Sequence, residues 1–165
     1  MLKSYDISRL NVLVIERNPL IRRILRETFS AFGVPNLYVT DCTEEGWDLF
    51  IDFEPDLVLT DWNHDLDGMR LLSKLRHDPE SVDPYCPVIV VTANTEMHHV
   101  LTARDRGMTE YLAKPVAPQT LYDRIVAVIE NERPFIRCSD FFGPDRRRRK
   151  RAIHYRGAER RSAVA

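Results

Sequence analysis

The stretch DLVLTDWNHDLDGMRLLSKLR, residues 56–76, decides the fold class of this chain. It begins with a run that is apolar at consecutive positions, which is typical of a strand covered on both faces in a parallel sheet. The acid Asp61 follows this run, and a segment with the apolar spacing of a helix begins at about Gly68. The stretch therefore predicts a strand, a polar loop and a helix, which is the repeating unit of an α/β protein.

Similar units occur on both sides of this stretch, between residues 11 and 133. Four further apolar runs are strand candidates: residues 11–15, 36–40, 87–91 and 110–113. Capping residues and apolar spacing predict five helices, at about residues 19–32, 43–54, 68–77, 95–106 and 118–132. Five strands that each precede a helix, with short connections, predict right-handed crossovers and an open, doubly wound sheet.

The composition excludes several broad classes of protein. The chain has 165 residues, of which 44% are hydrophobic and 30% charged, and this suits one domain with a tail rather than two catalytic domains. No apolar run approaches the roughly 18 residues of a membrane span, and the N-terminus lacks the apolar stretch of a signal peptide. The three cysteines show no metal-binding spacing. We therefore expect a soluble, cytoplasmic protein that does not insert into a membrane.

The net charge of −1 hides two parts of opposite sign. Residues 137–165 carry ten Lys or Arg and three acids, and ten minus three gives a net charge of +7. The other 136 residues must then sum to −8. This asymmetry predicts an acidic folded body with a basic arm that binds an anion, which could be a nucleic acid, a membrane surface, a nucleotide or the domain itself.

Polar residues follow the predicted strands at equivalent positions. Glu16 follows the first strand and Asp61 the third, while Thr92 and Lys114 follow the fourth and the fifth. In doubly wound sheets, ligands bind at the carboxyl ends of the strands, near the point where the strand order reverses. We therefore expect two acids, a hydroxyl and an ammonium group to converge at one edge of the sheet. The alternative is an ion network that only holds this edge together.

Over residues 10–133 the sequence resembles the CheY-like receiver domain of bacterial response regulators. The segments VLVIERNPLIRRIL, DLVLTDWNHDLDGMRLLSKLR, VIVVTAN and YLAKP carry the resemblance. It implies a flavodoxin-like α/β fold, with a parallel sheet of five strands in the order 2-1-3-4-5. It also implies that residues 1–133 form the receiver domain.

The resemblance implies a role for each polar residue at the sheet edge. Asp61 would be the phosphoacceptor, and Asn63 would offer a backbone carbonyl to a magnesium ion. Thr92 would meet the incoming phosphoryl group, and Lys114, before a cis proline, would stabilise its charge. Tyr111 would report the state of the site to an output face. These roles are chemically consistent, because a carboxylate nucleophile needs cations to gather the phosphoryl oxygens.

Two departures from the family pattern concern this chemistry. The family has two acids after the first strand, whereas here Arg17 follows Glu16. A guanidinium group cannot bind a metal ion, so we expect Arg17 to pair with Asp61, to impair the magnesium site and to hinder phosphorylation. His64 and Asp65 are the second departure, because the family often has an apolar residue and a proline there. We expect no metal ion at this site, and we expect the five histidines to be solvated or packed rather than metal ligands.

After Pro134 the chain loses helical spacing and becomes rich in arginine. Residues 134–165 offer few aliphatic groups to bury, so we expect this extension to be disordered until a ligand binds. It contains a degenerate repeat of aromatic, x, Gly, x, acid, Arg, Arg at residues 141–147, and again at 155–161. Arginine can address O6 and N7 of guanine, a carboxylate can accept from its other edge, and an aromatic ring can stack on it. The repeat therefore predicts a guanine ligand.

The extension resembles that of the Cle family, which are CheY-like proteins whose arginine-rich C-terminal extension binds the second messenger c-di-GMP. The resemblance implies that an intercalated dimer of c-di-GMP binds to Asp140, Phe142, Gly143, Asp145, Arg146, Arg147, Arg148, Arg149, Tyr155, Arg156, Gly157, Glu159, Arg160 and Arg161. It further implies, for some members, docking to the flagellar motor switch protein, with effects on motility and surface attachment and recruitment to the flagellated pole. The chain would then be a non-enzymatic signalling adaptor.

Two other functions stay open. The first is a phosphorylation-driven, single-domain response regulator whose extension is incidental. The second is a nucleic-acid-binding protein with a basic arm, whose affinity would fall steeply with salt and would not depend on Asp145 or Glu159. Acids at fixed positions have no use in a plain phosphate-binding arm, so we do not expect a nucleic acid as the partner.

Overall fold

The computed structural model describes residues 5–63, 67–131 and 133–146. Its centre is a parallel sheet with the strand order β2-β1-β3-β4-β5. The strands are β1 (Asn11–Ile15), β2 (Asn36–Thr40), β3 (Leu57–Asp61), β4 (Val88–Thr92) and β5 (Glu110–Ala113). This order confirms the doubly wound, flavodoxin-like fold that the sequence predicts.

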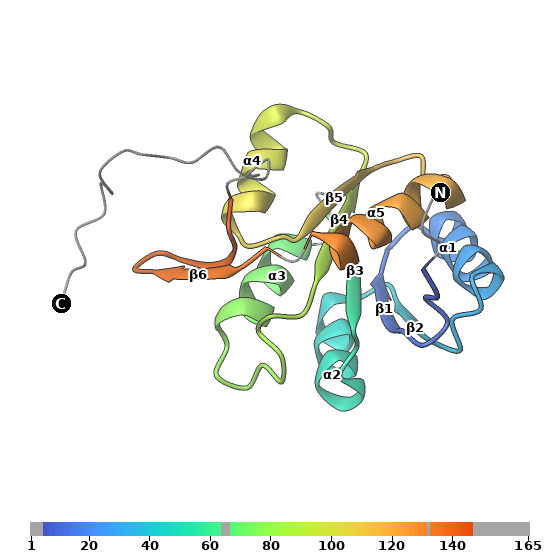
Figure 1. Cartoon of the computed structure of the whole chain (residues 1–165), viewed down its shortest axis with the longest axis horizontal. Coiled ribbons are helices and arrows are strands. Elements are labelled where there is room, and N and C mark those ends of the chain that lie inside the picture. Colours follow the sequence, from blue (N-terminus) through green and yellow to red (C-terminus); the bar gives the residue numbers. More distant parts are fainter. Residues whose placement is uncertain (1–4, 64–66, 132, 147–165) are drawn as a thin grey trace.

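Helices cover both faces of this sheet (Figure 1). They are α1 (Pro19–Ala31), α2 (Thr43–Phe53), α3 (Gly68–His77), α4 (Met97–Asp105) and α5 (Pro118–Glu130). On one face, α1 and α5 bury Phe29 and Leu121 completely. On the other face, α2 and α3 bury Phe50 and Leu72 completely, and α4 adds Ala103. The strands lie between two apolar layers, which is why their sequences are apolar at consecutive positions.

Local signals in the sequence fix where several elements begin. The Asn18 side chain accepts hydrogen bonds from the amides of Leu20 and Ile21, and a proline follows it, so the predicted cap of α1 is confirmed. The predicted start of α4 is two residues early, because the Asn94 side chain accepts a hydrogen bond from the Glu96 amide in a turn before the helix. None of the described helices is both long enough and apolar enough to cross a membrane.

The first part of the extension forms an antiparallel hairpin of β6 (Phe135–Cys138) and β7 (Phe141–Pro144). The hairpin lies on the side of the sheet that α3 covers (Figure 1). All four residues of β7 are buried. A Cβ atom added to Gly143 would lie 2.7 Å from the Cα of Gly107, so the backbone of β7 packs directly on the turn that follows α4.

This hairpin differs from the expectation that residues 134–165 are disordered without a ligand. The rings of Phe135 and Phe142 lie 5.0 and 5.2 Å from the ring of Tyr85, in the connection between α3 and β4. Aromatic contacts of this kind supply buried apolar surface that a count of aliphatic residues misses. The structure thus places residues 135–138 and 141–144 in paired strands, so regular structure extends past residue 133. Residues 147–165 lie outside the described residues.

Candidate functional site

The carboxyl ends of four strands bring the predicted polar residues to one edge of the sheet. Asp61 and Thr92 are the last residues of β3 and β4, while Glu16 directly follows β1 and Lys114 directly follows β5. The convergence that the sequence predicts is therefore present. The cis peptide bond expected before Pro115 is also present, between Lys114 and Pro115.

Lys114 joins the two acids in a buried ion network. Its Nζ atom lies 2.7 Å from Glu16 Oε2 and 3.1 Å from Asp61 Oδ1. Glu16 and Asp61 are each only 1% exposed. Burying a carboxylate without a cation beside it costs free energy of folding. Lys114 lowers this cost for both Glu16 and Asp61, because it contacts both carboxylates.

Burial raises the pKa of Glu16 above its ordinary value. The contact with Lys114 and the hydrogen bond from the Asn18 amide act in the opposite direction, and the charge of Asp61 adds to the rise. The site therefore holds one carboxyl group that resists losing its proton beside a second carboxylate.

Two of the four carboxylate oxygens of this network accept hydrogen bonds, and the other two lie in ion-pair contact with Lys114. Glu16 Oε1 accepts from the Asn18 amide at 2.8 Å, and Asp61 Oδ2 accepts from the side-chain amide of Asn63. The other two oxygens, Glu16 Oε2 and Asp61 Oδ1, contact Lys114 Nζ and have no further hydrogen-bond partner within the described residues. Magnesium needs near-octahedral coordination by oxygen atoms. The arrangement fits a magnesium ion poorly, because the two oxygens that accept no hydrogen bond both lie against the Lys114 ammonium group.

Arg17 occupies a different place from the one expected. Its side chain is exposed, whereas Asp61 is buried, and Lys114 makes the ion pair that we expected Arg17 to make. Both residues follow β1, where Glu16 is buried while Arg17 lies exposed in a bend of the chain. Arg17 therefore affects the site in two ways: it adds a positive charge at the surface nearby, and it stands where the family has a second acid.

Close packing holds the start of α3 against the end of β3. A Cβ atom at Gly68 would lie 2.1 Å from the carbonyl oxygen of Asp61, which leaves no room for a side chain at the start of α3. The absent side chain lets α3 begin directly against β3. The loop between them contains His64 and Asp65, which lie outside the described residues.

Thr92 and Tyr111 connect the site to the start of α4. The Thr92 hydroxyl donates to the Trp62 carbonyl at 2.8 Å and accepts from the Asn94 amide at 3.1 Å. The Tyr111 hydroxyl donates to the carbonyl of Asn94. The loop between β4 and α4 is therefore hydrogen-bonded to both residues through Asn94.

The structure describes only part of the predicted c-di-GMP site. Asp140 and Arg146 are exposed, and Asp145 is half-buried. Phe142 is only 3% exposed, and Gly143 is buried with it, so neither is free to contact a base while the hairpin is closed. The other residues of that site lie beyond the described part of the chain: Arg147, Arg148, Arg149, Tyr155, Arg156, Gly157, Glu159, Arg160 and Arg161.

The sequence analysis missed a buried cation, Arg76, beneath the hairpin. Burial lowers the pKa of this guanidinium to about 10. Its Nε donates to the Gly107 carbonyl at 3.0 Å, and Nη1 donates to the carbonyls of Pro84 and Cys86 at 2.9 and 2.8 Å. The spacing of four residues from the buried Leu72 places Arg76 on the inner face of α3, which is the signal that could have found it.

Comparison with known proteins gives one consistent result. Residues 12–126 match the response regulator receiver domain. The chemotaxis protein CheY homolog of Campylobacter jejuni is 31% identical over 122 residues, which are 73% of this chain and 92% of that protein. The chemotaxis protein CheY1 of Helicobacter pylori is 28% identical over 73% of this chain and 97% of its own length.

A solved structure supports the fold. A putative response regulator from Chloroflexus aurantiacus superposes with a TM-score of 0.66 at 21% sequence identity, over 74% of this chain and 98% of that one. At this level of identity the likeness concerns the fold alone. The receiver match ends at residue 126, before the hairpin and the arginine-rich run.

Proposed function

The chain belongs to the response regulator receiver domain family, and on that premise we propose that it is a non-enzymatic adaptor that binds c-di-GMP. In this proposal the arginine-rich extension binds an intercalated dimer of c-di-GMP. The receiver domain then docks to the flagellar motor switch protein and changes motility and surface attachment. The protein would act in the cytoplasm, at the flagellated pole.

One observation carries the proposal: the basic run begins at a fixed place on the domain. The Arg146 guanidinium lies 3.2 Å from Asp105, the last residue of α4, and 4.6 Å from the ring centre of Phe141. The hairpin therefore holds Arg146, the first residue of the basic run, at the end of α4. A ligand that recruits Arg146 would compete with Asp105, so binding would be linked to the surroundings of α4.

The proposed docking surface is the face formed by α4, β5 and α5. Tyr111 lies in β5 and Val100 in α4, and both side chains are partly buried against the same core cluster. Met97 and Leu101 of α4 are 72% and 38% exposed. Apolar side chains exposed together are typical of a surface that binds another protein. Tyr111→Ala should weaken binding to the motor switch protein without changing the affinity for c-di-GMP.

Calorimetric titration of the full chain with c-di-GMP, GTP and a short DNA duplex tests the ligand. We expect about two c-di-GMP per chain and much weaker binding of the other two ligands. Asp145→Ala should weaken c-di-GMP binding although it removes a negative charge, because it removes an acceptor for guanine. The variant keeps the hydrogen bonds that the Asp145 backbone makes with Pro134 and Arg133.

Asp52→Ala is the matched control, because Asp52 is an exposed acid on α2 and its loss changes the net charge equally. It should leave the affinity for c-di-GMP unchanged. Tighter binding after both substitutions would mean that phosphate charge alone carries the affinity. The nucleic-acid alternative would then replace this proposal.

A second candidate function is phosphorylation-driven signalling, which the geometry around Asp61 favours. The carboxylate is held by Lys114 Nζ at 3.1 Å, as a phosphoacceptor would be. Because Asn63 donates to one oxygen of Asp61, Lys114 contacts the other, and Arg17 replaces an acid, we expect little phosphoprotein after incubation with a small phosphodonor and magnesium. Arg17→Asp should increase labelling of Asp61. Efficient labelling of the unaltered chain would make this candidate the better function.

A further inference from the structure

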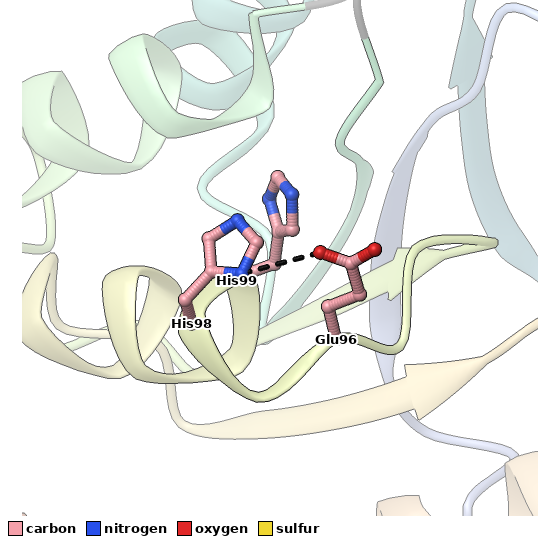
Figure 2. Close-up of side chains that lie close together, drawn as sticks. All are labelled: Glu96, His98 and His99. Atoms are coloured by element: carbon pink, nitrogen blue, oxygen red, sulfur yellow. Dashed lines mark ion pairs between the residues drawn. The ribbon is translucent and has the colours of Figure 1, made fainter.

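Three metal-binding side chains lie together at the start of α4, away from the ion network. They are Glu96, which precedes the helix, and His98 and His99 in its first turn. One ligand atom of each lies within 4.8 Å of the others. Figure 2 shows the three side chains projecting to the same side of the chain, with Glu96 directed at His98.

Contacts hold these side chains near one another. His98 Nδ1 lies 3.3 Å from Glu96 Oε2, and the centres of the two imidazole rings are 4.0 Å apart. The His99 ring also meets the edge of Trp62, with centres 4.8 Å apart, and is only partly exposed. His99 is thus the fixed member of the group, while Glu96 and His98 are exposed and can rotate.

The donor set selects one class of metal ion. Two imidazole nitrogens and one carboxylate oxygen suit zinc and neighbouring first-row transition metals, whereas magnesium and calcium prefer oxygen atoms alone. Bonds of about 2.0–2.1 Å in a tetrahedral zinc site place the ligand atoms about 3.4 Å apart. Side-chain rotations at two exposed positions can close the present separations to that value.

We propose that Glu96, His98 and His99 form a binding site for Zn²⁺ or a similar divalent transition metal ion. With three protein ligands, a tetrahedral ion keeps a fourth position for water or for a further ligand. The sequence did not indicate this site, because no two histidines in it are four residues apart, which is the spacing of a metal-binding pair on a helix. Here the turn before α4 supplies the third ligand instead.

Hydrogen bonds and a ring contact connect the proposed metal site to the residues around Asp61. The Glu96 amide donates to the Asn94 side chain at 3.3 Å, and the Asn94 carbonyl accepts from Tyr111. On the other side, His99 packs on Trp62, whose carbonyl accepts from Thr92. A bound ion would therefore tie the first turn of α4 to the loop after β4, and would stabilise the arrangement in which Thr92 and Tyr111 are seen.

Calorimetric titration of the full chain with Zn²⁺ tests the site, with His98→Ala as the main variant. This variant should lose one equivalent of zinc or bind it at least about tenfold more weakly, because one of three ligands is gone. His77→Ala is the matched control, because His77 is an exposed histidine on α3 outside the group. It should bind zinc within about twofold of the unaltered chain.

The same two variants distinguish zinc bound at this site from zinc bound elsewhere on the chain, because only His98→Ala removes a ligand of this site. Both positions are exposed, so neither substitution should disturb folding, which circular dichroism would check. Excess Mg²⁺ should not compete with Zn²⁺. Failure of the unaltered chain to bind zinc at millimolar concentration would overturn the proposal, as would equal zinc binding by the two variants.

Discussion

The hairpin of the extension should depend on the buried side chain of Phe142. The side chain is 3% exposed, and its ring centre lies 5.4 Å from that of Phe135. The guanidinium of Arg137 lies 4.2 Å above the same ring. Replacing Phe142 with alanine removes all of these contacts at once, and it should open the hairpin while leaving the central sheet folded.

The expected size of the effect follows from the burial. Truncating a buried phenylalanine to alanine costs about 3–5 kcal/mol, and each 1.4 kcal/mol is about tenfold, so opening should become about 100 to 4,000 times more favourable. A hairpin of two strands is marginally stable on its own. Its order therefore depends on docking, and the loss should appear in the hairpin first.

Hydrogen exchange measured by mass spectrometry reports on each segment separately. Amides of residues 135–144 should lose protection in Phe142→Ala, up to complete exchange, while amides of β1, β3 and β4 should keep theirs. Phe53→Ala is the matched control, because Phe53 is the same residue type at 43% exposure on α2. It should leave the hairpin as protected as before.

Two outcomes would refute this reasoning. Unchanged exchange of the hairpin in Phe142→Ala would mean that the ring does not pack as described. Equal loss of protection in the hairpin and in the central strands would mean that both open as one cooperative unit, and that the hairpin is not a separately docked element.

Three more substitutions test other features. Gly107→Ala should lower hairpin protection at least about tenfold, because Gly107 has φ +93° and a Cβ would lie 2.8 Å from the Phe142 carbonyl, and a left-handed residue costs about 1–2 kcal/mol. Lys114→Met should lower the free energy of unfolding at pH 7, measured with urea, by about 3–5 kcal/mol, because it leaves Glu16 and Asp61 buried without their cation. Glu16→Gln should change how the free energy of unfolding depends on pH. The raised pKa of Glu16 means that the folded state binds more protons, so the free energy of unfolding of the unaltered chain should rise as pH falls from 7 towards the ordinary pKa, and the variant should lack this rise in urea titrations at several pH values.

The central sheet could be predicted because each strand and helix carries its own signal. Apolar runs, the Asn18 cap and the helical spacing are local properties of the sequence, and all were confirmed. The ends of elements were less certain, since DLVLT predicts a strand from residue 56 whereas β3 is Leu57–Asp61. Apolarity does not mark the residue at which pairing with a neighbouring strand stops.

The hairpin and the Arg76 contacts could not be predicted in the same way. The hairpin depends on Tyr85 and Gly107, which are distant in sequence and become neighbours only after the sheet has formed. The ion network around Asp61 could be predicted only in part. The topology predicted that Glu16, Asp61 and Lys114 would meet, but it did not predict that Arg17 would lie exposed in the bend after β1.

The docked hairpin also determines the point on the domain at which the sequence continues into the remaining arginines. Because Arg146 is held beside Asp105, a ligand bound by the residues that directly follow it in sequence would be covalently confined to the neighbourhood of the end of α4. Short linkers give effective concentrations in the millimolar range. A captured ligand could therefore engage the surface of the domain through contacts that would be too weak to detect between separate molecules.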